Sequence, residues 1–170
     1  MTKQKKFLQN PQQYFNTLNL IYYFMVAGPL GVFTYFYLKF AQQGMIQTAF
    51  PDQPDPVVIY IIPLATIIVM ALAYSMYRNL MRKMDLTLPL TEKLSRFAKY
   101  AIVKYAFLEV ASLLIVAGFA LSKLKFYIIL YVITLVVFSF HRPTQRRVGS
   151  DLKLNEEEKE KLWSEQDFEQ

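Results

Sequence analysis

The chain contains no cysteine and only one histidine, His141. Without cysteine it can form no disulfide, no thiolate metal site and no cysteine nucleophile. A single histidine also excludes a metal or haem site that draws several histidines from this chain. The sequence shows no Ser-His-Asp, paired-carboxylate or phosphate-loop pattern. We therefore expect a protein that is not an enzyme and that holds no cofactor and no metal.

Charged residues are scarce over four long stretches of the 170-residue chain, which is 54% hydrophobic. A spanning helix needs about 20 mostly apolar residues to cross roughly 30 Å of hydrocarbon. The apolar runs 18–38 and 57–77 have no charge, the run 101–121 carries Lys104 and Glu109, and the short run 124–140 has Lys125 near its start, whose ammonium can reach the surface. The predicted membrane spans are residues 18–40, 57–78, 98–122 and 124–141.

The predicted fold is all-α, an integral membrane four-helix bundle made of two helical hairpins. Residues 1–145 form the membrane domain, and residues 146–170 form an acidic cytoplasmic tail. Only Ser122 and Lys123 separate the last two spans, which predicts a tight antiparallel turn.

The distribution of basic residues predicts the orientation of the spans. Lys3, Lys5 and Lys6 precede the first span, whereas the first loop, residues 42–56, has Asp52 and Asp55 and no basic residue. Cytoplasmic loops are enriched in lysine and arginine. Both termini and the second loop are therefore expected on the cytoplasmic side, with the protein in a bacterial cytoplasmic (inner) membrane. The basic residues that support this arrangement in the second loop and after the last span are Arg78, Arg82, Lys83, Lys93, Arg96, Lys99, Arg142, Arg146 and Arg147.

Two segments outside the spans have recognisable patterns. Residues 79–96 alternate apolar and basic side chains, which predicts an amphipathic loop, part of which lies in the cytoplasmic membrane interface. Thr91 is the expected N-cap of the helix that enters the third span. In the tail, Asn155 followed by three glutamates predicts the start of a short helix, with Leu162 and Trp163 on its apolar edge. We expect this tail to be soluble and mobile.

Glu109 is the most informative residue of the spans. It lies eight residues past Ala101, which is about 12 Å deep at 1.5 Å per residue. A charge at mid-membrane costs at least roughly 2.5–3.5 kcal/mol, so the carboxyl group must be protonated or face the helix interior. Tyr105 lies one turn away, and Thr66 and Thr134 are expected at the same depth. These four residues form a candidate proton, ion or helix-contact site.

Other features have both a functional and a structural interpretation. Gly28-Pro29 in the first span and Pro63 in the second could break these helices at a binding site, but kinks that improve packing are the favoured interpretation. Lys104 lies on another side of its helix than Glu109 and is expected to extend to the cytoplasmic surface. Candidate contacts with lipid headgroups are Arg78, Arg82, Lys83, Arg146 and Arg147.

The sequence favours a non-catalytic accessory or scaffold component of a membrane assembly. The alternative is a proton- or ion-coupled transporter or channel subunit that uses Glu109. The expected partners are the lipid bilayer and another membrane protein or a second copy of the chain. No nucleic acid is expected, because the basic residues flank apolar runs, where membrane topology requires them.

The predicted orientation can be tested with reporter fusions. Green fluorescent protein fused after Gln170 should fluoresce, and alkaline phosphatase fused there should be inactive, because that enzyme matures only outside the cytoplasm. Phosphatase inserted in residues 42–56 is the matched control and should be active. Phosphatase activity at Gln170 would contradict the topology.

Overall fold

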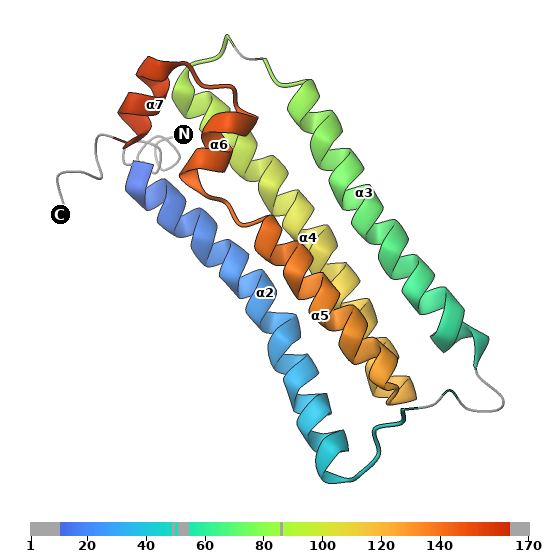
Figure 1. Ribbon diagram of the computed structural model, residues 1–170. Helices are drawn as coiled ribbons and strands as arrows, with labels where there is room; N and C mark the ends of the chain where they lie inside the picture. Colours follow the sequence, from blue (N-terminus) through green and yellow to red (C-terminus); the bar gives the residue numbers. More distant parts are fainter. Residues whose placement is uncertain (1–10, 49, 51–54, 86, 164–170) are drawn as a thin grey trace, which may run out of the picture.

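The computed structural model describes residues 11–48, 50, 55–85 and 87–163, and its regular elements are helices throughout (Figure 1). The predicted all-α class is therefore confirmed for these residues. The three lysines before residue 7 and Asp52, which entered the orientation argument, lie outside the described residues. The elements in chain order are α2 (Pro11–Gln42), the π-helix η1 (Val57–Ile61), α3 (Ile62–Arg82), α4 (Leu90–Ser122), α5 (Lys125–Phe140), α6 (Gln145–Asp151) and α7 (Glu156–Trp163).

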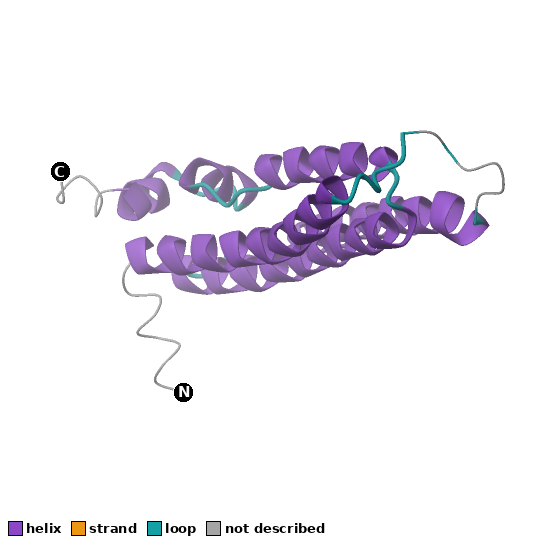
Figure 2. Cartoon of the chain, turned by 90° about the horizontal axis from the view of Figure 1, so that it is seen from below, coloured by secondary structure: helices purple, strands orange, loops and turns teal. Residues whose placement is uncertain are grey.

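The long helices lie side by side and alternate in direction (Figure 1). We call the end where α2 begins the cap end, because α6 and α7 lie there beyond the end of α5 (Figure 2). We call the opposite end the turn end. At the turn end Lys123, in the left-handed conformation (φ 57°), follows α4 and leads into α5 after one more residue. The predicted tight turn is thus confirmed.

Three of the helices are long and apolar enough to cross a membrane by themselves: Gln12–Gln42, Val57–Arg82 and Leu90–Ser122. These lengths and compositions indicate an integral membrane protein. The fourth, α5, has 16 residues and reaches the required length only together with α6, from which it is bent by 74°. At 1.5 Å per residue α4 is about 50 Å long, so it extends well beyond the hydrocarbon layer.

Helix α4 lies at the centre of the fold and packs against α2, α3 and α5. Its buried residues recur at helical spacing along nearly its whole length, for example Ala101, Tyr105, Leu108 and Ser112. The other helices turn large apolar side chains outward, as lipid-facing helices do. Leu20, Phe24, Leu64, Ile67 and Phe140 are all more than half exposed.

Tyrosine hydroxyl groups connect the helices to one another. Tyr14 donates to the carbonyl of Leu94 (2.8 Å) and thereby joins α2 to α4. Tyr22 donates to the carbonyl of Phe138 (2.9 Å), and Tyr127 donates to the carbonyl of Val58. These bonds use the second lone pair of a helix carbonyl and satisfy a polar group that is buried among apolar side chains.

The buried core is divided into two apolar clusters. The cap-end cluster includes Tyr14, Phe97 and Leu108, and the turn-end cluster includes Phe33, Phe119 and Tyr131. In the turn-end cluster the rings of Phe33 and Tyr131 are stacked, with centroids 4.1 Å apart. Along the helices the buried polar residues Thr66, Ser112 and Thr134 lie between the residues of the two clusters.

Proline does not unwind the first helix. Helix α2 continues through Pro29, whose ring is buried. In the second span the π-helical turn η1 comes directly before Pro63, and the N–H of Ile62 donates to the carbonyl of Val57. A π-turn accommodates a residue that breaks the regular ladder of hydrogen bonds. The favoured interpretation of these prolines as packing features is consistent with this arrangement.

The predicted interfacial loop is wrong in its extent. Helix α3 continues to Arg82 and α4 begins at Leu90, so the connection is limited to residues 83–89. The predicted N-cap Thr91 is inside α4, whose N-cap is Pro89 in an extended conformation. Met84, Leu94 and Phe97 are buried in the cap-end cluster. These three apolar side chains are covered by the protein itself.

Gly118 in α4 lies directly against Tyr127 of α5. A Cβ atom at this position would overlap the ring of Tyr127, which is fully buried and hydrogen-bonded to the carbonyl of Val58. The ring therefore has little freedom to move aside. By contrast, a Cβ at Gly31 in α2 would meet no atom within 4 Å.

Gly118→Ala should lower the free energy of unfolding by about 1–3 kcal/mol, the usual cost of overpacking. The matched control Gly31→Ala should leave stability unchanged or raise it by up to about 1 kcal/mol, because alanine is the better helix former. Thermal unfolding of both variants in the same detergent measures the difference. Equal midpoints for the two variants would show that α4 and α5 are not packed as described.

Candidate functional site

Three of the four predicted site residues, Thr66, Glu109 and Thr134, lie along their helices between residues of the two apolar clusters, whereas Tyr105 belongs to the cap-end cluster. Thr66 lies between Val58 and Ala73 in the second span, and Thr134 lies between Tyr131 and Phe138 in α5. Thr66, Thr134 and Ser112 are buried. We call Thr66, Glu109, Ser112 and Thr134 the middle polar layer.

Glu109 faces α2 at Gly28. A Cβ atom placed on Gly28 would lie 3.9 Å from Oε1 of Glu109, which is ordinary van der Waals contact. Within the described part of the chain the carboxyl group has no hydrogen bond or ion pair. The absence of a side chain at Gly28 leaves room beside the carboxyl group, so the glycine and the acid occupy matching positions on α2 and α4.

The expected donors to Glu109 make other hydrogen bonds. The hydroxyls of Thr66 and Thr134 donate to the carbonyls of Ile62 and Leu130 in their own helices, each at 2.9 Å. Tyr105 donates to the carbonyl of His141 at 3.0 Å. The structure thus places the four residues at neighbouring levels without joining them by hydrogen bonds. A direct role for Glu109 stays a prediction.

A second polar site lies at the cap end and was missed by reasoning from the sequence. A cleft of about 390 Å³ opens there between α3, α4 and α6. Its residues come from segments that are far apart in the chain, which is why no local pattern revealed it. The residues that line it are Tyr74, Tyr77, Arg78, Met81, Lys104, His141, Arg147 and Asp151.

Lys104 forms the floor of this cleft. The residue is only 5% exposed, so the expectation that its side chain extends to the aqueous surface is wrong. Its ammonium lies 4.0 Å from the ring centre of Tyr77 and 5.1 Å from that of Tyr105. Aromatic faces attract a cation and stabilise it by about 0.5–2 kcal/mol, which offsets part of the cost of keeping the ammonium inside. The signal in the sequence was a lysine inside an apolar run.

Three other residues of the cleft, Tyr77, Asp151 and His141, take part in hydrogen bonds. Tyr77 donates to Oδ2 of Asp151 at 2.7 Å, which ties α3 to α6. His141 donates from Nδ1 to the carbonyl of Val137 at 2.7 Å. Of the predicted headgroup contacts, Arg78 and Arg147 line the cleft, and the structure gives no cleft contact for Arg82, Lys83 or Arg146.

The tail folds back on the helices at the cap end. Val148, Leu152 and Leu162 are each at most 1% exposed and belong to the cap-end cluster. The expectation of a mobile tail is therefore wrong for residues 146–163, because apolar side chains of this segment pack in the cap-end cluster with those of α2 and α4. The side chain of Trp163 lies outside the described residues.

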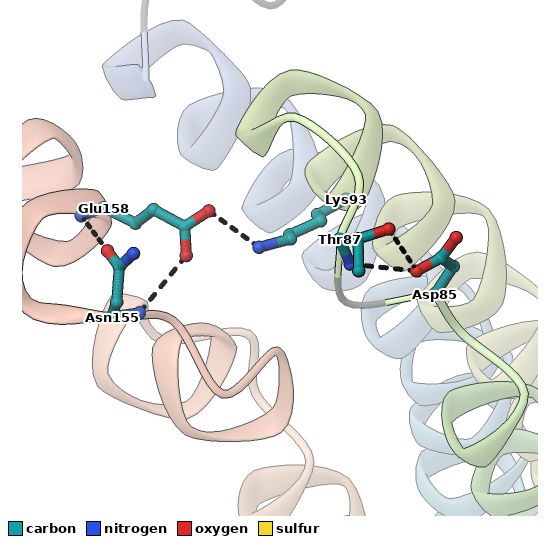
Figure 3. Close-up of polar contacts among 5 residues, drawn as sticks. All are labelled: Asp85, Thr87, Lys93, Asn155 and Glu158. Atoms are coloured by element: carbon teal, nitrogen blue, oxygen red, sulfur yellow. Dashed lines mark hydrogen bonds and ion pairs between the residues drawn. The ribbon is translucent and has the colours of Figure 1, made fainter.

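The start of α7 is fixed by a reciprocal cap and an ion pair (Figure 3). The N–H of Glu158 donates to Oδ1 of Asn155 (2.7 Å), and the N–H of Asn155 donates to Oε2 of Glu158 (3.2 Å), which is a capping box. The predicted helix start at Asn155 is thereby confirmed. Oε1 of Glu158 accepts from Nζ of Lys93 at 2.7 Å, with side chains 18% and 6% exposed.

The connection between α3 and α4 has its own local structure. Thr87 donates its hydroxyl (2.7 Å) and its N–H (2.9 Å) to Oδ1 of Asp85 (Figure 3). These two bonds, that of the hydroxyl above all, hold the pKa of Asp85 below its ordinary value. The stability that these bonds give to the turn is therefore fully present above the pKa of an aspartate in the unfolded chain, about 4. It is lost as the pH falls below that value and the carboxylate is protonated.

No protein-family model matches the chain, and neither a curated protein nor a solved structure matches it. The class of protein is therefore defined by the chain itself, an all-helical integral membrane protein with a docked helical cap.

Lys93→Met should loosen α7 at the cap end, because it removes the largely buried ion pair between Lys93 and Glu158. The expected cost is about 1–3 kcal/mol, seen as faster amide hydrogen exchange in residues 156–163 while α3 is unchanged. Glu156→Gln is the control: it breaks the exposed pair with Lys159 and should cost no more than about 0.5 kcal/mol. Equal exchange in the two variants would contradict the docking.

Proposed function

We propose that this chain crosses a bacterial cytoplasmic membrane four times as a four-helix bundle, with both termini in the cytoplasm. Supporting this, basic residues concentrate at the cap end of the helices. Lys39, Lys123 and Lys125 are the basic residues of the helix ends at the turn end. Helix α5 completes the fourth span, and α6, bent away from it, lies at the membrane surface. The basic residues of the cap end include Arg78, Arg82, Lys83, Lys93, Arg96, Lys99, Arg142, Arg146 and Arg147.

Within this membrane frame the chain acts as a non-catalytic accessory or scaffold component. The observation that carries this proposal is the docked cap. Helix α7 is anchored by Lys93 and by buried Leu162, so its outward carboxylates Glu156, Glu157 and Glu160 have fixed positions. A fixed acidic surface above a small membrane domain is suited to bind a basic segment of a partner.

Helix α3 offers a second contact surface inside the membrane. One side of α3 packs on α4, and Leu64, Ile67, Ile68 and Leu72 on the other side are 49–61% exposed. Apolar helices in lipid associate through close packing with another helix. The partner is a second membrane protein or a second copy of this chain.

The alternative function is proton or ion coupling at Glu109. It is favoured by one observation: the carboxyl group lies in the middle polar layer beside Gly28 and has no partner among the described residues. An intramembrane acid of this kind is available to bind a proton or a cation.

One pair of measurements separates the two functions. The full chain is purified in mild detergent for co-purifying proteins and is also placed in proteoliposomes for proton and cation flux. The scaffold proposal predicts that a partner co-purifies with the wild type and with Glu109→Gln but not with the double variant Glu157→Lys/Glu160→Lys. It also predicts that the wild type carries no proton or cation flux. Thr91→Lys, which adds a positive charge at the same end but outside α7, should keep the partner.

A stable monomer without any partner would contradict the scaffold proposal. Flux in the wild type that disappears in Glu109→Gln would establish the alternative in its place. The thermal midpoint of the double variant must equal that of Thr91→Lys, since the substituted side chains are exposed.

A further inference from the structure

The cleft at the cap end carries an excess of positive charge. Lys104, Arg78 and Arg147 line it with basic side chains, and Asp151 is the one carboxylate among the residues that line it. One oxygen of that carboxylate already accepts a hydrogen bond from the hydroxyl of Tyr77. The remaining polar groups of the cleft are the hydroxyl of Tyr74 and the imidazole of His141, and neither adds a negative charge.

The ammonium of Lys104 is the least compensated of these cations. It contacts the faces of two tyrosine rings but has no ion pair or hydrogen bond in the described part of the chain. Removing an ammonium from water is costly unless an anion and hydrogen-bond acceptors replace the lost hydration. Aromatic contacts alone recover only part of this cost.

The cleft continues inward as a smaller apolar cavity. This cavity has a volume of about 150 Å³ and shares Tyr74, Lys104 and His141 with the cleft. Its other residues are apolar and come from α3, α4 and α5. They are Met70, Ala73, Leu108 and Val137. A polar opening that leads to an apolar space fits a molecule with a charged head and a hydrocarbon chain.

We propose that the cleft binds a phosphate group, with Lys104 and the guanidinium groups of Arg78 and Arg147 as its donors. The apolar cavity beneath favours a phosphate that is carried by a membrane lipid, whose chain enters between α3 and α5. This proposal goes beyond the scaffold function and does not depend on it. It also differs from general attraction to anionic lipid, because it assigns one buried lysine as the determinant.

The test uses the full chain in a non-ionic detergent and three probes: dioctanoyl phosphatidic acid, inorganic phosphate and dioctanoylglycerol, which lacks a phosphate. Thermal-shift titrations give apparent Kd values. Lys104→Met should weaken the binding of phosphatidic acid by about ten- to a hundredfold, the loss of one charge-assisted hydrogen bond. Lys99→Met, an exposed lysine of the same helix, is the matched control and should bind as the wild type does.

Asp151→Asn is expected to bind the phosphate probe more tightly than wild type, because it removes the opposing charge while its carbonyl oxygen still accepts from Tyr77. A purely structural role of the cleft would not raise affinity. Without ligand, Lys104→Met should unfold at the same temperature as wild type or higher, since it removes a buried charge. If one of the two variants, Asp151→Asn or Lys104→Met, fails to fold, the affinity of the other still tests the proposal.

Binding of phosphatidic acid but not of inorganic phosphate supports a lipid ligand. Equal affinity for both, lost in Lys104→Met, supports a phosphate site whose source is the free anion. The proposal is overturned if neither phosphate probe shifts the wild type, if dioctanoylglycerol binds as well as phosphatidic acid, or if Lys104→Met binds like Lys99→Met.

Discussion

The packing of three helices around α4 is the constraint on which the rest of the structure depends. In lipid the surrounding chains are as apolar as the side chains, so helices gain little from burying apolar surface against one another. Close packing and interhelical hydrogen bonds have to hold them. Here α4 provides most of the buried side chains, and Gly118 lets α5 approach it closely.

Tyrosine hydroxyls that donate to carbonyls of other helices add directional bonds to this packing. Tyr14, Tyr22 and Tyr127 each join a different pair of elements. Such a bond fixes the rotation and the height of one helix relative to the next, which apolar packing alone does not do. The cap-end and turn-end clusters each contain tyrosines of this kind, so both ends of the helix group are held in register.

Much of the helical framework could be predicted from the sequence, because long uncharged runs and an amide followed by three acids are local signals. The α4–α5 turn and the start of α7 are of this kind. The docking of α6 and α7 could not be predicted, since the apolar spacing of Val148, Leu152 and Leu162 says that one face is buried but not against what. The loop was misjudged for the same reason: Leu94 and Phe97 suit a lipid interface as well as a protein core.

The cap-end cleft shows a second limit of reasoning from sequence. A lysine near the end of an apolar run can extend to water or remain inside over aromatic rings, and the choice depends on Tyr77, which lies in another helix. The depth of Glu109, by contrast, follows from counting residues along one helix. Counting placed Thr66 and Thr134 at its level, but it could not show that their hydroxyls bond to their own backbones.

The two carboxylate oxygens of Glu158 bind two different partners. One completes the first turn of α7 by accepting from the backbone of Asn155, and the other accepts from Lys93 at the start of α4. The geometry of that first turn is therefore coupled to the position of a residue more than sixty places earlier in the chain. A displacement of the beginning of α4 is therefore transmitted to the first turn of α7 through this side chain, in addition to the apolar packing of the cap-end cluster.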